Sequence, residues 1–430
     1  MKLLSNGKIV VGFDLCDNYS QISYANAGEN TVETLSLVAG EQNYNIPTLL
    51  CKKIGVNQWL YGKDALKFMQ EEETKEQGIL VENLVSLAIN GEPIQIDGES
   101  YQPESLLALF FKRCLGMLSQ IAPPEKIGNL MITCEKVNGR MLEVIEQVVA
   151  SVRLKADKVF IQSHVESFYH FMLYQPEELW RTQTLLCEYG ENEMKISRLE
   201  CNRRTTPIVV YVKEASFPFP TGILPENEEL RKEKMTHFDE TFLHLLEAEC
   251  QNQTVASVYL IGEQFAGDWM QESLKYLCKG RRVFQGNNLY SKGACFGMLE
   301  RLLPGEAGKT HVFLGEDKLR TNIGMKVLRQ GQDSYFALLD AGVNWFESEN
   351  TVEFYLQEGN VVELLLTSLI GGGSRSVPIT LEGLPEGSSR LKMHLHFKDE
   401  KHLLIEIEDL GFGVFRPATK ECWKQEVELE

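Results

Sequence analysis

The hydrophobic pattern at the start of the chain predicts a β-hairpin. Residues 9–13 form a β-rich apolar run, residues 14–18 are polar and turn-forming, and residues 20–25 resume an alternating pattern. A second copy begins at Thr184, where TLLCEYGENEMKISRLE again indicates strand, turn and strand. The hairpin pattern therefore occurs twice, each time with acidic residues at its turn.

Strand and helix patterns alternate between and after the two hairpins. Buried strands are predicted at residues 127–133, 159–162 and 258–261. Helices are predicted at 139–151, 164–173, 238–250, about 268–278 and 293–303, with a longer one entered at Pro103. Such alternation predicts an α/β fold with a parallel or mixed sheet and helices on its faces.

The pattern changes after Pro304. Residues 304–311 have the composition of a linker, and helical periodicity then disappears. Short strands separated by turn residues are predicted at 351–356, 361–367, 391–397 and 403–407. We therefore expect a first region over residues 1–303 and an all-β domain of the sandwich type over residues 310–430.

Composition and charge narrow the choice of partners. The chain has 430 residues, of which 43 are basic and 61 acidic, for a net charge of −18. Such a surface repels phosphate, which disfavours nucleic acid and anionic membranes as partners. The ten cysteines are scattered without C-x-x-C pairs, and no signal peptide or apolar run of transmembrane length stands out. We expect a cytoplasmic protein.

The order of these elements resembles that of the seventy-kilodalton heat-shock (DnaK-like) chaperones, within the actin, sugar-kinase and heat-shock chaperone ATPase superfamily. The resemblance is carried by the two hairpins, by a glycine turn at Gly262 after an apolar strand, and by the segment ITLEGLPEGSSRLKMHLHF near the C-terminus. It implies a two-lobed actin-like fold with ribonuclease-H-like lobes at 1–180 and 181–303, the second truncated. The β-sandwich at 310–430 is similar to the chaperones' substrate-binding domain.

The resemblance also implies where a nucleotide would bind. In the family the two hairpin turns hold the phosphates and the metal of ATP, and the later glycine turn holds the adenosine. The positions that match this vestigial nucleotide site are Gly12, Asp14, Asp17, Glu188, Gly190 and Gly262. Asp14 and Glu188 would be the metal ligands if the site is active.

The hairpin turns depart from the family pattern. Cys16 replaces a glycine, and Asp17 replaces the phosphate-contacting threonine, so a carboxylate would face the phosphates. In the second turn, Glu191, Asn192 and Glu193 stand where the family has a glycine run, and side chains there block close backbone approach.

Four further nucleotide-handling features are altered or missing. The family's catalytic lysine should fall near residues 81–88, but no Lys or Arg occurs from residue 76 to 111. Ser163 is the best match for its catalytic glutamate. The helical subdomain that grips the adenine is absent, and Glu263 replaces the second glycine of the adenosine turn. We interpret the ATP site as degenerate.

Two functions remain open. The first is a non-hydrolysing binding or scaffold protein with a protein or peptide partner, for which no cofactor is expected; Asp14 would then only cap the following turn. The alternative is an ATP-dependent peptide-binding chaperone with an unorthodox magnesium-nucleotide site. A nucleophilic Cys16 or Cys187 is disfavoured, because no histidine lies near either in sequence.

Overall fold

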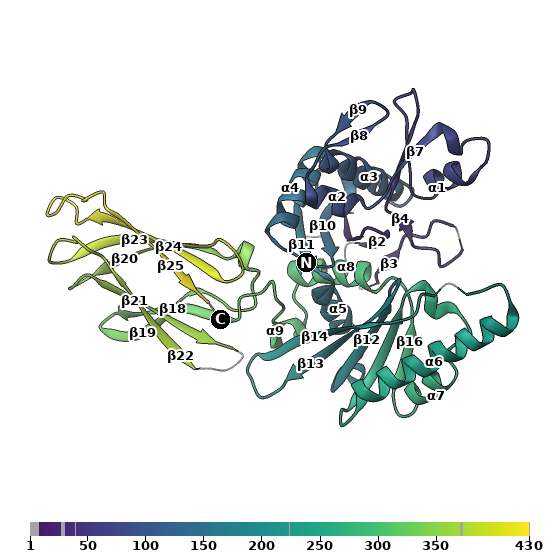
Figure 1. Ribbon diagram of the computed structural model, residues 1–430. Helices are drawn as coiled ribbons and strands as arrows, with labels where there is room; N and C mark the ends of the chain where they lie inside the picture. Colours follow the sequence, from purple (N-terminus) through teal and green to yellow (C-terminus); the bar gives the residue numbers. More distant parts are fainter. Residues whose placement is uncertain (1–7, 27–30, 39, 223, 370–372, 430) are drawn as a thin grey trace. The chain divides into compact units, whose positions relative to one another are not determined.

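The computed structural model describes residues 8–26, 31–38, 40–222, 224–369 and 373–429. The chain is mixed α/β and divides into two compact units (Figure 1). The first unit combines Met1–Cys201 with Val210–Thr310, and the second combines Asn202–Val209 with His311–Glu430. Within the described ranges, no helix is both long and apolar enough to cross a membrane.

The first hairpin forms the centre of a sheet with strand order β11-β10-β1-β2-β3, and β4 pairs with β2. Strand β1 (Ile9–Leu15) pairs antiparallel with β2 (Tyr19–Asn26) and parallel with β10 (Ile127–Cys134). Strand β10 in turn pairs parallel with β11 (Lys158–Ser163). Every residue of β1 and β10 is buried, as expected for apolar strands covered on both faces.

The second hairpin forms the centre of another sheet, which contains the strand order β16-β15-β12-β13-β14. Strand β12 (Gln183–Tyr189) pairs antiparallel with β13 (Glu193–Asn202) and parallel with β15 (Val255–Ile261). Strand β15 pairs parallel with β16 (Arg282–Gln285). The two sheets therefore repeat one pattern of order and direction around their central strands.

The remaining elements of the first unit surround these sheets. Its other strands are β3 (Glu33–Thr34), β4 (Ile46–Pro47), β5 (Leu50–Lys53), β6 (Trp59–Tyr61), β7 (Gly78–Val81), β8 (Ile94–Ile96), β9 (Glu99–Tyr101) and β14 (Ile208–Pro218). Its helices are α1 (Gly62–Gln70), α2 (Leu84–Asn90), α3 (Pro103–Met117), α4 (Gly139–Val152), α5 (His164–Leu173), α6 (Glu228–Cys250), α7 (Glu272–Leu277), α8 (Leu289–Leu302) and α9 (Glu306–Thr310).

The second unit contains two four-stranded antiparallel sheets, β19-β18-β21-β22 and β20-β23-β24-β25. Its strands are β17 (His311–Phe313), β18 (Thr321–Arg329), β19 (Gln332–Leu339), β20 (Glu349–Leu356), β21 (Val361–Ser368), β22 (Ser374–Thr380), β23 (Ser389–Phe397), β24 (His402–Gly411) and β25 (Cys422–Glu428). The four strands predicted here coincide with β20, β21, β23 and β24.

Three predicted boundaries were wrong for local reasons. Helix α6 starts ten residues before the predicted residue 238, because Asn227 accepts hydrogen bonds from the amides of Glu229 and Leu230. Helix α7 starts at Glu272 rather than near 268, where the Asp239 carboxylate binds its first amides. The predicted linker contains the short helix α9, with Lys309 paired to Glu306 at 2.8 Å.

The backbone of helix α8 packs directly against the backbones of β1 and α5. A Cβ added to Gly12 of β1 would lie 2.3 Å from the Ser291 carbonyl oxygen and 2.4 Å from the Cys295 nitrogen. A Cβ added to Gly293 of α8 would lie 2.0 Å from the Ser167 carbonyl oxygen of α5. Real Cβ atoms do not approach backbone this closely, so both positions require glycine.

Gly12→Ala should destabilise the protein by about 3 kcal/mol, because the new methyl group forces the backbones of β1 and α8 apart. Gly116→Ala in α3 is the matched control: a Cβ there meets nothing within 4 Å, and alanine favours a helix by about 0.5–1 kcal/mol. Denaturant unfolding of both variants measures the difference. Equal midpoints for Gly12→Ala and the wild type would contradict the close approach.

Candidate functional site

A cavity of about 830 Å³ opens where the two hairpin turns meet the ends of parallel strands. Residues 15–19, 134–136 and 190–193 contribute to its lining, with His164, Glu188 and other side chains. Asp14 and Glu188 occupy equivalent places, since Asp14 is the sixth residue of β1 (Ile9–Leu15) and Glu188 the sixth of β12 (Gln183–Tyr189). In α/β sheets, ligands bind at the carboxyl ends of the strands, which makes this cavity the candidate site.

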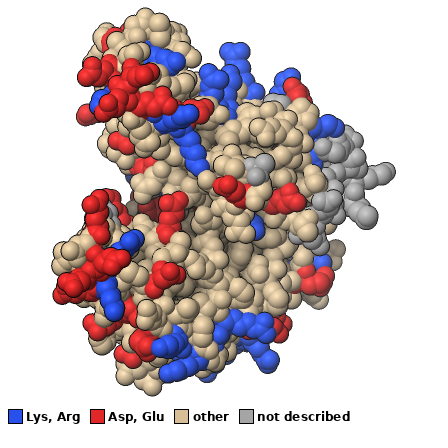
Figure 2. Space-filling view, turned by 90° about the vertical axis from the view of Figure 1, so that its right-hand side faces the viewer, with Lys and Arg blue, Asp and Glu red and all other residues tan. Residues whose placement is uncertain are grey.

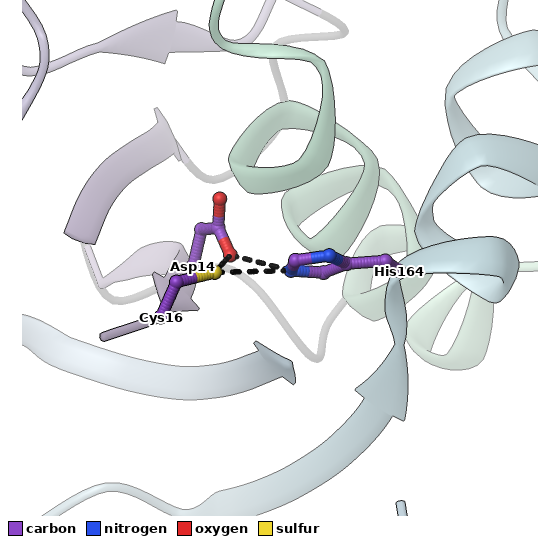
Figure 3. A group of neighbouring side chains, drawn as sticks. All are labelled: Asp14, Cys16 and His164. Atoms are coloured by element: carbon purple, nitrogen blue, oxygen red, sulfur yellow. Dashed lines mark hydrogen bonds and ion pairs between the residues drawn. The ribbon is translucent and has the colours of Figure 1, made fainter. Parts of the chain in front are cut away.

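Asp14, Cys16 and His164 form a compact group beside the cavity (Figure 3). The His164 Nε2 atom lies 2.8 Å from Asp14 Oδ1 and 3.6 Å from Cys16 Sγ, and Cys16 Sγ lies 3.4 Å from the same Asp14 oxygen. Asp14 and His164 are buried, and Cys16 is partly exposed. His164 is placed by the turn from β11 into α5, where the Ser163 hydroxyl accepts a hydrogen bond from the Glu166 amide at 3.4 Å.

The second hairpin reaches this group through Tyr290 of α8. The Tyr290 ring stacks on His164 with ring centroids 3.9 Å apart, and its hydroxyl donates to Glu188 Oε2 at 3.0 Å. Burial opposes the charged imidazolium, but the Asp14 carboxylate outweighs it and raises the pKa of His164. For the Glu188 carboxylate, burial raises the pKa, because it disfavours the charged form. His164, Lys195 and the hydrogen bond from Tyr290 act in the opposite direction.

The thiol of Cys16 is not activated as a nucleophile. Burial and the charges of Asp14 and Glu188 raise its pKa well above the usual range, whereas a nucleophilic cysteine requires a lowered pKa. In addition, the same ring nitrogen of His164, Nε2, contacts both Asp14 and Cys16. In a catalytic triad the two ring nitrogens contact different partners.

Asp17 lies in the cavity lining, but its carboxylate is engaged by the start of α2 and is not free for a phosphate or a metal. Its Oδ1 accepts hydrogen bonds from the amides of Val85 at 2.8 Å and Ser86 at 3.1 Å, and its other oxygen bonds the Ser86 hydroxyl. These amides belong to the first turn of α2, whose own N-cap residue, Asn83, makes no side-chain cap bond. Asp17 therefore caps α2 and ties the first hairpin turn to it.

The three glycines of the predicted site have separate placements. Gly12 packs against α8, as described above, and Gly190 lines the cavity, where its amide donates to the Glu193 carbonyl at 2.9 Å. Gly262 precedes a 3₁₀ turn, Glu263–Ala266, with a φ of +117° that favours glycine. A Cβ on Gly262 would also lie 2.8 Å from the Tyr189 carbonyl oxygen.

One expectation for the carboxylates was wrong. Asp14 was expected to cap the following turn, but its Oδ1 instead contacts the His164 and Cys16 side chains, because both lie across the sheet end from it. Asp14 and Glu188 were named as the metal ligands only for the case of an active nucleotide site. Among the described residues, the group with metal-ligand spacing contains Asp14, Cys16 and His164 without Glu188, which is held by Tyr290.

His164 is the functional residue that the sequence did not identify. No histidine is near Cys16 in sequence, as expected, but His164, 148 residues later in the chain, lies 3.6 Å from the Cys16 Sγ atom. One signal was available: His164 directly follows a buried strand predicted to lie parallel in the same sheet, and such strand ends meet at one edge.

Comparisons with known proteins identify two families. A family of unknown function (DUF5716), in its C-terminal part, matches residues 31–316. A domain of unknown function (DUF8552) matches residues 318–429. No curated protein matches the sequence significantly. The junction between the two matches falls close to the boundary of the compact units after Thr310.

Asp17→Ala should lower the free energy of unfolding by about 1 kcal/mol, because it removes the cap from two amides of α2. Asp17→Asn is the matched control, since asparagine caps as well as aspartate and should stay within about 0.5 kcal/mol of the wild type. Denaturant unfolding distinguishes them. An equal loss in both variants would mean that the charge of Asp17, and not its cap, is what the protein uses.

Proposed function

The chain belongs to the DUF5716 family, and we propose that it is a non-hydrolysing, protein-binding protein built on a heat-shock-chaperone-like, actin-like frame. Its nucleotide site is degenerate, and its partner is a protein or peptide. The second unit, in this proposal, is a β-sandwich similar to the chaperones' substrate-binding domain.

The repeated sheet supports the actin-like frame. In each copy, a hairpin strand pairs antiparallel with its successor and parallel with a later strand, which pairs parallel with the next. This is the arrangement expected of two duplicated ribonuclease-H-like lobes. The acidic residues at the sixth position of β1 and β12 fit the same duplication.

The observation that carries the proposal is that the three carboxylates matching the family's nucleotide site already have partners within the protein. Asp14 pairs with His164, Asp17 caps α2, and Glu188 accepts from Tyr290. A magnesium-nucleotide site needs such oxygens free to bind the cation, directly or through water. Here each of these carboxylates already commits at least one oxygen to a protein partner.

The charge of the cavity also disfavours a triphosphate. Five acids and two lysines line it: Asp17, Glu135, Glu188, Glu191 and Glu193, with Lys136 and Lys195. The Lys195 ammonium is already paired, with Glu214 at 2.9 Å and Glu135 at 3.7 Å. Acidic side chains likewise gather above and below a hollow at the left edge of Figure 2, with a few basic side chains among them. The excess of carboxylates in the lining repels an anionic ligand such as a triphosphate.

An exposed apolar loop between β24 and β25 supports a protein partner. Val414 is fully exposed and the Phe415 side chain is 91% exposed, while Phe412 packs edge-on against Tyr355. Exposed apolar groups gathered in this way mark interaction surfaces.

The same loop is held in a defined conformation. The buried Asp409 carboxylate accepts from the Gly411 amide at 2.9 Å, the Thr419 amide at 3.0 Å and the Arg416 guanidinium at 2.7 Å. Hydrogen bonding by these groups lowers the pKa of Asp409 even though burial opposes it. A loop ordered before binding loses less entropy when its partner docks.

In a calorimetric titration, magnesium-ATP should bind with a dissociation constant no lower than about 1 mM, which corresponds to a binding free energy of about −4 kcal/mol. The physical reason is that the cavity is acidic and its carboxylates already have partners. Steady-state phosphate release should be at background. A micromolar dissociation constant, with turnover that disappears in Asp14→Asn, would instead support the alternative of an ATP-dependent chaperone.

The full chain should suppress aggregation of a chemically unfolded model protein without ATP, and the double variant Val414→Ser, Phe415→Ser should lose most of this effect. Because both side chains are exposed, the variant should keep its stability within about 0.5 kcal/mol. Leu328→Ser, at a position 58% exposed on β18, is the matched control and should behave as the wild type. Equal suppression by all three proteins would exclude this loop as the contact surface.

A further inference from the structure

We propose that Asp14, Cys16 and His164 form a zinc-binding site at the wall of the cavity, with one coordination position open toward it. This site goes beyond the proposed binding function and needs no nucleotide. The three residues come from two segments far apart in sequence, the end of the first hairpin strand and the start of α5.

The distances among the three ligand atoms are those of a nearly formed tetrahedral site. Zinc lies about 2.0–2.3 Å from oxygen, nitrogen and sulfur ligands, so neighbouring ligand atoms lie roughly 3.3–3.6 Å apart. The observed distances are 3.6 Å from Cys16 Sγ to His164 Nε2 and 3.4 Å from Cys16 Sγ to Asp14 Oδ1. Two of the three edges of the ligand triangle therefore already have the required length.

The third edge is shorter because it is a hydrogen bond in the absence of metal. His164 Nε2 and Asp14 Oδ1 are 2.8 Å apart. This separation must grow by about 0.5 Å when the cation takes the place of the shared proton. Both side chains keep their direction in that change, since they already point to a common centre with Cys16 (Figure 3).

The donor set selects the metal. Thiolate, imidazole and carboxylate together suit zinc, whereas magnesium and calcium require oxygen donors throughout. Three protein ligands and a free fourth position characterise zinc sites that bind a water or a substrate atom, in contrast to the four protein ligands of structural sites. Cys16 and His164 line the cavity, so the free position is open to a ligand that enters it.

Zinc titration of the full-length protein, stripped of metal with a chelator and followed with a competing chromophoric chelator, tests the site. We expect one zinc per chain with submicromolar affinity. Cobalt(II) in its place should show sulfur-to-cobalt charge-transfer absorption and the intense visible bands of a four-coordinate ion. Cys16→Ser should abolish the charge-transfer band and weaken zinc binding at least about tenfold.

Cys278→Ser is the control, because Cys278 is exposed and outside the group, and its titration should match the wild type. If Cys16→Ser does not fold, alkylation of the wild type decides: bound zinc should protect Cys16, read by mass spectrometry, and leave Cys278 reactive. No stoichiometric zinc, or zinc that neither depends on Cys16 nor protects it, would overturn the proposal. The ATP titration is independent, so either proposal can fail without the other.

Discussion

The contact of α8 with β1 and α5 is the constraint on which the first unit depends. Gly12 and Gly293 let three backbones meet at distances that no side chain permits. Because the interior is close-packed, an element seated this tightly has one position. That position brings Tyr290 onto the His164 ring and its hydroxyl to Glu188. The geometry of the cavity thus follows from a glycine contact outside it.

Acidic side chains around the cavity form hydrogen bonds that connect neighbouring elements. Asp14 connects β1 to α5, Asp17 connects the first hairpin turn to α2, and Glu188 connects β12 to α8. Asp14 is buried, and a buried carboxylate without a partner would be costly, so this residue requires a particular neighbour. Charges that would bind a cation in a nucleotide site here specify how the parts of the unit meet.

Local patterns predicted the elements well, and contacts between distant residues poorly. Alternating and apolar runs located β1, β12 and β15, and helix α5 was predicted at its observed bounds. The partners of individual side chains were harder to predict from the sequence. Asp17 looked like a phosphate-loop residue because its partners, the α2 amides, lie 68 residues away. The group around Cys16 was missed because proximity in sequence was used in place of proximity at a sheet edge.

The packing of α8 on β1 joins segments that are synthesised at very different times. The Cys295 thiol of α8 contacts the Val10 carbonyl of β1 across 285 residues of chain. During synthesis from the N-terminus, the first hairpin is therefore complete long before the helix that covers it exists. Its first strand, apolar except for Asp14, stays without this cover until most of the first unit has been made. Nascent chains of this protein thus expose an aggregation-prone strand until α8 has been synthesised.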